Sequence, residues 1–206
     1  IGPLGQLMEP YGSLSFEDAY DAFREQIIAG AKAADLVLIE TMSDIYETRA
    51  AVLAAKENSN LPVICTMTFQ ADGRTLTGTD PMTMVNILQN LGVAVVGLNC
   101  SLGPQEMMPL VNEVLKYSGV PVIIQPNAGL PRMIGDKTVF EISPEEFAAY
   151  GRNMAESGVR ILGGCCGTTP EHIKALKQAL SGLKPVKTQV KRISAASSGT
   201  CTVLLG

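Results

Sequence analysis

The stretch Val159-Arg-Ile-Leu-Gly-Gly-Cys-Cys-Gly-Thr-Thr-Pro-Glu-His172 decides the fold of this chain. Its first four residues are mostly apolar and fit a β-strand, and two glycines and two cysteines follow where that strand ends. Thr169-Pro170-Glu171 then has the composition of a helix N-terminus. The stretch therefore predicts a strand, a glycine-rich turn and a helix in direct succession, which is the repeating unit of α/β proteins.

The same alternation of strand and helix recurs along the chain. Strand-like apolar runs occupy residues 35–40, 62–69, 93–99, 120–126 and 159–163. Amphipathic, helix-like stretches occupy residues 17–34, 44–57, 81–91, 105–117, 144–157 and 170–180. Several strand runs are nearly continuous in apolar residues, as is typical of parallel strands covered on both faces. The pattern predicts an α/β fold with a parallel sheet.

Two α/β architectures fit this pattern. A doubly wound sheet is one, although no Gly-x-Gly-x-x-Gly follows any strand. The other is a (β/α)₈ TIM barrel, which needs about 250 residues and eight strands. Five strand-helix units after a leading helix would be the C-terminal portion of such a barrel, so we expect an N-terminally incomplete part. The chain also begins Ile-Gly-Pro-Leu-Gly rather than with methionine, as expected if an earlier part is missing.

Composition excludes several classes of protein. The 206 residues are 46% hydrophobic, which suffices for a core, and the net charge of −4 argues against a nucleic-acid surface. No apolar run reaches the roughly 18–20 residues that cross a bilayer. Five cysteines are an odd number without the spacing of a disulfide framework, which favours a reducing, cytoplasmic location.

The cysteines at strand ends are the main candidates for chemistry. Cys165 and Cys166 are adjacent, so they cannot easily bond to each other, but both can donate thiolates to one soft cation. Cys100 follows another apolar strand. Three cysteines at one edge of a sheet predict a zinc site with one open position, although the usual Cys-x-x-Cys spacing is absent and spacing alone leaves a packing role open. Cys65, within a strand, and Cys201, near the C-terminus, are interpreted as core residues.

Polar residues also mark the other strand ends. They are Glu40, Gln70 after Phe69, Asn99 before Cys100, and Asn127 after Pro126. Glu40 fits a ligand-binding carboxylate or a helix-capping and ion-pairing one equally well. Asn127 alone fits a turn residue with positive φ. His172, the only histidine, is interpreted as a helix-capping or surface residue and not as a zinc ligand.

These motifs resemble a known family. Residues 97–104 (Gly-Leu-Asn-Cys-Ser-Leu-Gly-Pro) and 163–173 (Gly-Gly-Cys-Cys-Gly-Thr-Thr-Pro-Glu-His-Ile) are similar to the zinc-binding signature of the homocysteine S-methyltransferase family. Residues 35–42 and 68–79 match the family in the same order, so the resemblance covers about residues 1–182. It implies a (β/α)₈ barrel.

The resemblance also implies roles for individual residues. Cys100, Cys165 and Cys166 match the family's three zinc thiolates, and Glu40 matches the carboxylate that meets the amino group of homocysteine. Asn127 falls where a cobalamin-dependent methionine synthase has an asparagine as fourth zinc ligand while homocysteine is absent. An Asp-Gly-Ala-type loop of the family's first strand has no counterpart in this chain.

Within the family, the tail favours one type. Residues 184–206 are basic and serine-rich, and they resemble the connector from a homocysteine barrel (here 1–183) to a folate-binding barrel. We therefore expect a zinc-dependent methyltransferase domain of the cobalamin-dependent methionine synthase type. It would activate homocysteine as a thiolate and accept a methyl group from methylcobalamin bound by another domain.

Three other functions remain open. The chain could be a stand-alone enzyme that uses S-methylmethionine or betaine, or a barrel whose zinc is purely structural. A structural zinc site normally has four protein ligands, and a fourth well-placed thiol or histidine would favour it. An aldolase or lyase would want a lysine at a strand end, and none is present there.

Overall fold

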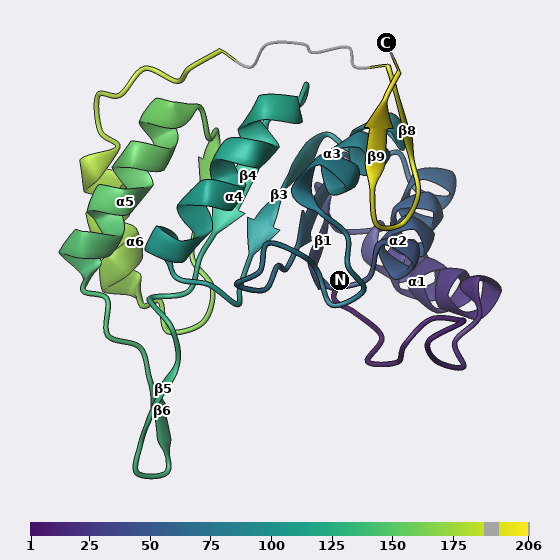
Figure 1. Cartoon of the computed structure of the whole chain (residues 1–206), viewed down its shortest axis with the longest axis horizontal. Coiled ribbons are helices and arrows are strands. Elements are labelled where there is room, and N and C mark those ends of the chain that lie inside the picture. The colour runs from purple at the N-terminus through teal and green to yellow at the C-terminus, as the bar shows by residue number, and fades with distance from the viewer. Residues whose placement is uncertain (188–193, 206) are drawn as a thin grey trace.

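The structure, a computed structural model, describes residues 1–187 and 194–205 of the chain (Figure 1). The helices are α1 (Phe16–Gly30), α2 (Ile45–Asn58), α3 (Pro81–Asn90), α4 (Pro104–Tyr117), α5 (Pro144–Ser157) and α6 (Pro170–Ala179). The strands are β1 (Val37–Met42), β2 (Val63–Met67), β3 (Val95–Asn99), β4 (Val122–Gln125), β5 (Arg132–Ile134), β6 (Lys137–Val139), β7 (Ile161–Leu162), β8 (Ala195–Ser197) and β9 (Thr202–Leu204).

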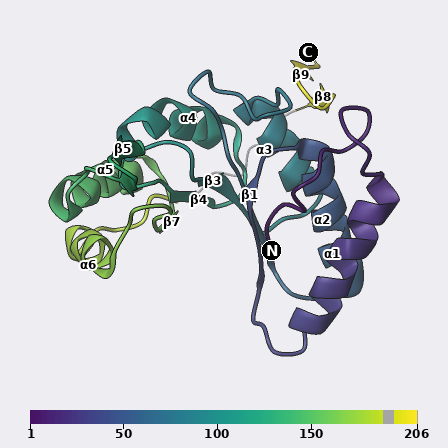
Figure 2. The same cartoon turned by 90° about the horizontal axis from the view of Figure 1, so that it is seen from below.

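Five of these strands form one parallel sheet in the order β1-β2-β3-β4-β7. A helix lies between each of these strands and the next along the chain, as parallel neighbours require. Figure 2 shows the helices following one another in chain order around the outside of the strands. This is the arrangement of a (β/α)₈ barrel, of which the sheet forms an open arc, and the predicted fold class is confirmed.

Interior positions of the sheet are tightly packed. Ile39, Cys65, Val96 and Ile124 are fully buried on successive strands. At Gly97 in β3 a β-carbon would lie 1.7 Å from the carbonyl oxygen of Ile123 in β4. The backbones of β3 and β4 therefore approach so closely at this point that only glycine fits.

The helix starts agree with the sequence. Ser15, Asp44, Asp80 and Ser143 each accept a hydrogen bond from a backbone amide in the first turn of the helix that they cap. Helix α5 has the predicted bounds. Strand β1 is displaced to 37–42 from the predicted 35–40, so Glu40 lies inside the strand and not at its end.

Two antiparallel hairpins were not predicted. The first, β5–β6, projects from the molecule between β4 and α5, and its chain reverses at Gly135 (φ 60°) (Figure 1). The second, β8–β9, lies within 184–206, the segment predicted to be a connector. It packs on α3, where Asn86 donates to the Ser197 hydroxyl (2.8 Å). Residues 188–193 of that segment lie outside the described residues.

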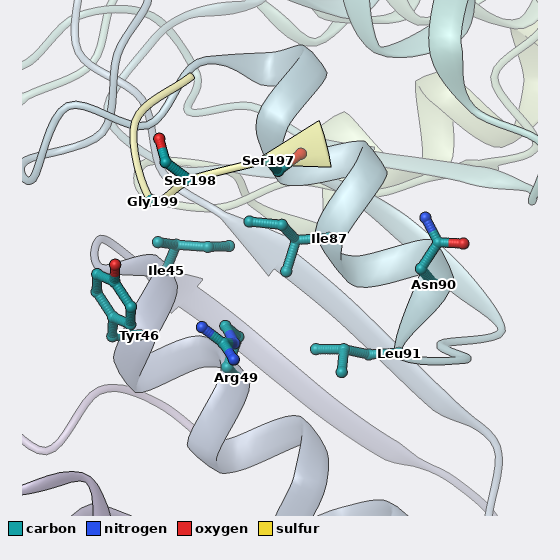
Figure 3. A pocket seen from close by; sticks show the side chains of 9 residues that line it. All are labelled: Ile45, Tyr46, Arg49, Ile87, Asn90, Leu91, Ser197, Ser198 and Gly199. Carbon is teal, nitrogen blue, oxygen red and sulfur yellow. The ribbon is translucent and has the colours of Figure 1, made fainter. Parts of the chain in front are cut away.

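A cavity of about 290 Å³ lies between the β8–β9 hairpin and helices α2 and α3 (Figure 3). Its walls are Ile45, Tyr46, Arg49, Ile87, Asn90, Leu91, Ser197, Ser198 and Gly199. These residues belong to the helices and the hairpin, and none is a strand-end residue that the sequence singled out. Within residues 1–187 and 194–205, no helix is long and apolar enough to span a membrane.

Candidate metal and substrate site

Three thiols meet at the carboxyl-terminal edge of the parallel sheet. The sulfur atoms of Cys100, Cys165 and Cys166 all lie within 4.8 Å of one another, and those of Cys100 and Cys166 are 3.8 Å apart. Cys100 follows β3, whereas the other two follow β7, and β4 lies between these strands. The sheet order therefore brings together residues that are 65 or more positions apart in sequence.

Backbone hydrogen bonds to the end of β4 hold the Cys165-Cys166 turn. The Cys165 amide donates to the carbonyl of Pro126 (2.9 Å), and the Ala128 amide donates to the carbonyl of Cys166 (2.9 Å). The Cys166 amide donates to Oδ1 of Asn127 (3.0 Å). The side chain of Asn127, which is 3% exposed, thus lies beside the thiols, and its φ is not positive. The interpretation of Asn127 as a left-handed turn residue is wrong.

Cys100 is held by an unusual turn. Cys100 and Ser101 both have left-handed backbone conformations, with φ of 63° and 60°. The Cys100 amide donates to the carbonyl of Gln125 (3.1 Å), and the Ser101 hydroxyl lies 2.9 Å from that of Thr68 after β2. Left-handed conformations are unfavourable for residues with a β-carbon, so these contacts keep strain at the site.

Strand β1 is irregular where it carries Glu40. Ile39 pairs with Cys65 and Met42 with Met67, so two residues of β1, Glu40 and Thr41, stand opposite one residue of β2. Such a bulge redirects the side chains of the bulged strand. Thr41 takes a left-handed conformation (φ 62°) within it, and Glu40 is half-buried.

The buried amide of Asn99 joins this bulge to the thiols. Its Oδ1 accepts from the Thr41 amide (2.8 Å) and the Thr66 hydroxyl (2.8 Å). Its Nδ2 donates to the Thr41 hydroxyl (2.7 Å) and reaches the sulfur of Cys165 at 3.9 Å. Thr41, Cys100 and Ser101 are the non-glycine residues with positive φ in the described chain, and all of them lie in this cluster.

The thiols disfavour negative charge in the absence of a cation. Burial, together with the neighbouring Cys100, raises the pKa of the Cys165 thiol to about 12. Burial and Cys100 also raise the pKa of Cys166. Several thiolates this close repel one another, and a bound divalent cation reverses the balance because it stabilises each thiolate.

The donor set fits zinc. Three sulfurs bound at about 2.3 Å to a tetrahedral ion would lie about 3.8 Å from one another. The observed separations of 3.8 Å and below 4.8 Å need only a small contraction to reach this geometry. Cys65 is fully buried inside β2, and burial raises its pKa, so it behaves as the predicted core residue.

The predictions for Cys201 and His172 have different outcomes. The prediction of Cys201 as a core residue is wrong, because it is exposed in the turn between β8 and β9. His172 caps α6 as predicted, because its Nδ1 accepts from the Thr169 amide (3.2 Å). It is not a surface residue: it is 7% exposed and its Nε2 lies 2.9 Å from the carbonyl of Ile142.

The apolar pattern of the sequence did not reveal the roles of Asn99 and Thr41. The sequence indicates a polar residue at a strand end at position 99, but its two contacts with Thr41 depend on the bulge in β1, which leaves no mark in that pattern. The side-chain amide of Asn99 is the feature of the sequence that could have indicated these contacts. A buried asparagine at the end of an apolar strand requires partners for its two donors and its acceptor oxygen.

Comparison with known proteins finds relatives along nearly the whole chain. The family model described as homocysteine S-methyltransferase matches residues 1–180. The methionine synthase of Mycobacterium tuberculosis (strain ATCC 25618 / H37Rv) is 32% identical over 205 residues, covering 96% of this chain and 17% of that protein. The methionine synthase of Mycobacterium leprae (strain TN) is 33% identical over 188 residues, covering 88% of this chain and 16% of that protein. The chain therefore spans about a sixth of the length of these relatives.

Among solved structures, the apo form of the homocysteine methyltransferase MmuM from Escherichia coli is similar with a TM-score of 0.71. The match has 23% sequence identity and covers 87% of this chain and 61% of that one. A metallated form of the same enzyme matches with a TM-score of 0.63, at 22% identity and with 81% and 52% of the two chains covered. At these identities the matches establish the fold.

Proposed function

The chain belongs to the homocysteine S-methyltransferase family, and on this premise we propose that it is the homocysteine-binding domain of a zinc-dependent methionine synthase of the cobalamin-dependent type. The observation that carries the proposal is the meeting of three thiols, from Cys100, Cys165 and Cys166, at one edge of the sheet. In this proposal they hold zinc, and homocysteine is methylated on sulfur to give methionine.

The thiols leave room for a substrate ligand. Three protein ligands are typical of catalytic zinc, and among the described residues no further histidine, cysteine or acidic group joins the cluster. When bound, zinc would take the homocysteine sulfur as a thiolate at neutral pH, which supplies the nucleophile. Asn127, whose Oδ1 lies next to the Cys166 amide, is the candidate fourth ligand in the absence of homocysteine.

The protein's own residues would orient the amino acid. Glu40 lies on the bulge of β1 and is half-buried, and it precedes Thr41, whose amide donates to the Asn99 side chain beside Cys165. A carboxylate there would accept hydrogen bonds from the ammonium group of homocysteine, which fixes the side chain with its sulfur toward the thiols. Partial burial strengthens such a contact, because fewer waters compete for the charges.

The methyl donor would come from another part of the protein. The mycobacterial relatives are named methionine synthases, and the chain spans about 17% of the length of one of them. We assign residues 1–183 to the homocysteine barrel and 184–206 to a connector toward a folate-binding domain. Methylcobalamin, bound by a further domain, would deliver the methyl group to the thiolate. Thiols that must stay reduced suit a cytoplasmic location.

Two other functions compete with this proposal. A stand-alone methyltransferase using S-methylmethionine or betaine would share the same thiols, and the similarity to MmuM supports the shared fold. A structural zinc site would need a fourth protein ligand, and the cluster of described residues offers three thiols. MmuM, whose fold this chain shares, also occurs in a metallated form, which supports metal binding by this fold.

The test is the metal and its ligands in the full-length protein. We expect one zinc per chain, and X-ray absorption should report three sulfur ligands plus one nitrogen or oxygen ligand without homocysteine. Added homocysteine should raise the sulfur count to four. A site with an unchanged ligand set after homocysteine addition would favour structural zinc, and absence of zinc would reject the proposal.

A further inference from the structure

Asn99 has no assigned role, yet it is 1% exposed and uses every hydrogen-bonding position of its amide. Two donors, the Thr41 amide and the Thr66 hydroxyl, point at Oδ1, both at 2.8 Å. Two acceptors face Nδ2: the Thr41 hydroxyl at 2.7 Å and the Cys165 sulfur at 3.9 Å. An asparagine side chain can make four such contacts, so none of its capacity is left over.

The orientation of this amide is fixed by its neighbours. A backbone N–H can only donate, so the amide of Thr41 requires the oxygen of Asn99 on its side. The nitrogen must then face the Thr41 hydroxyl and Cys165. The contacts with Thr41 on the β1 bulge therefore fix the amide orientation in which an N–H group approaches the sulfur.

These contacts connect two parts of the site that the chain does not connect directly. Thr41 follows Glu40 in the bulge of β1, whereas Cys165 lies after β7. Thr41 also has a left-handed backbone (φ 62°), a conformation that a β-branched residue keeps only when its surroundings enforce it. Asn99 contacts both the amide and the hydroxyl of this residue, and so provides that enforcement.

We propose that Asn99 is a positioning residue that sets the Glu40 bulge and the Cys165 sulfur relative to each other. Its N–H group also withdraws electron density from that sulfur, as hydrogen bonds to ligand atoms do in metal sites. The inference rests on the proposed function, since it concerns zinc held by Cys165 and homocysteine held by Glu40. Asn99 itself touches neither.

A purely structural role would have different consequences. Thr66 is fully buried and bonds the same Oδ1, but it contacts neither Thr41 nor Cys165 in the described hydrogen bonds. Thr66→Val removes that bond without changing side-chain shape. It is therefore the matched control, because it disturbs the packing around Asn99 while leaving the connection between Thr41 and Cys165 in place.

Two variants test the connection in the full-length protein. Asn99→Ala removes all four contacts. Asn99→Asp keeps the oxygen that accepts from Thr41 and Thr66 and replaces both donors by an acceptor, at the cost of a buried carboxylate. Each would be loaded with Co²⁺ as a spectroscopic substitute for zinc, and homocysteine binding would be measured by calorimetry.

We expect the sulfur-to-cobalt charge-transfer bands of both Asn99 variants to move to longer wavelength, because loss of an N–H group raises the energy of the sulfur lone pairs. Homocysteine should bind about 10-fold more weakly, at the lower end of the about 10- to 100-fold loss of metal affinity or activity that follows a change in a partner of a metal ligand. Thr66→Val should lower the thermal midpoint while leaving the bands and the homocysteine affinity as in the wild type.

The outcomes separate this inference from the proposed function. If the wild-type protein binds no metal, both are rejected. If it binds metal and homocysteine, but Asn99→Asp has the wild-type bands and affinity, only the role of Asn99 is rejected. The role of Asn99 is also rejected if Thr66→Val shifts the bands and the affinity as much as the Asn99 variants, since the effect then belongs to packing.

Discussion

The interior of the parallel sheet and its carboxyl-terminal edge follow opposite rules. Inside the sheet, Ile39, Cys65, Val96 and Ile124 are fully buried, and β2 and β3 are regularly paired. At the edge, three thiols are crowded together, a strand bulges, and the backbone turns left-handed at Thr41, Cys100 and Ser101. The regular interior provides the stability that lets the edge keep an unfavourable arrangement suited to a ligand.

The largest expected difference between the two regions concerns metal. Cys166→Ala removes one of three clustered sulfurs and should abolish stoichiometric zinc and methyl transfer, with Cys100→Ala and Cys165→Ala behaving alike. Cys65→Ala, inside β2, should keep its zinc and lose only packing, about 1 kcal/mol of unfolding free energy. Zinc analysis and denaturant titration of the full-length variants measure both effects. Zinc retained by the Cys166 variant and lost by the Cys65 variant would show that the ligand set is wrong.

Adding a methyl group to a glycine should destabilise the protein inside the sheet and not at the end of an outer helix. Gly97→Ala would place a β-carbon 1.7 Å from the Ile123 carbonyl, so β3 and β4 must move apart. We expect a loss of about 3 kcal/mol in unfolding free energy, at the upper end for overpacking. Gly30→Ala, at the end of α1 with nothing within 4 Å of the new carbon, is the matched control and should not destabilise. Equal urea midpoints for the two variants would contradict the close approach of β3 and β4.

At the edge, Glu40→Gln tests recognition of the amino acid. The variant should bind homocysteine about 1.5–3 kcal/mol more weakly, the value of a hydrogen bond to a charged group, while zinc content stays normal. A simple thiol without an amino group should bind as to the wild type, because it never makes the contact. Calorimetry with both compounds decides the matter. If both lose affinity equally, Glu40 supports the scaffold and is not a substrate contact.

The smallest effect concerns a buried acid away from the edge. Burial raises the pKa of Glu47 in α2, opposed in part by the hydrogen bond that its Oε1 accepts from the Leu4 amide (2.6 Å). An acid with a raised pKa in the folded state contributes its stability below the ordinary carboxyl pKa and loses it as pH rises through the folded value. We expect unfolding free energy to decrease over that range in the wild type and to change less in Glu47→Gln. Denaturant titrations from acidic to neutral pH measure the slopes; parallel curves would exclude this contribution.

Much of the interior could be predicted from sequence. Apolar runs and helix caps indicated the five strands of the parallel sheet and the six helices, because burial and capping leave periodic signals in the chain. The glycine-cysteine turn after β7 and the cysteine after β3 also identified the thiol cluster, since parallel strands end at one edge. Periodic elements, and side chains placed directly at the end of a strand, can therefore be located from the sequence.

The edge was less predictable. The bulge that carries Glu40 is a register shift, and a shift of one residue leaves the apolar composition of β1 unchanged. The left-handed turn at Cys100 depends on contacts with Gln125 and Thr68 from two other strands. The hairpins β5–β6 and β8–β9 are short and mostly exposed, so no buried face marks them in the sequence.

The left-handed residues have a consequence for how this protein would respond to selection. Ser101→Gly would relieve a φ of 60° at an exposed position, so a screen for heat-resistant variants should enrich it. The same change deletes the hydroxyl that meets Thr68 and frees the turn that presents Cys100. Heat resistance and catalytic competence would then be opposed traits at one position, and a stabilised lineage would drift away from its activity unless both were selected together.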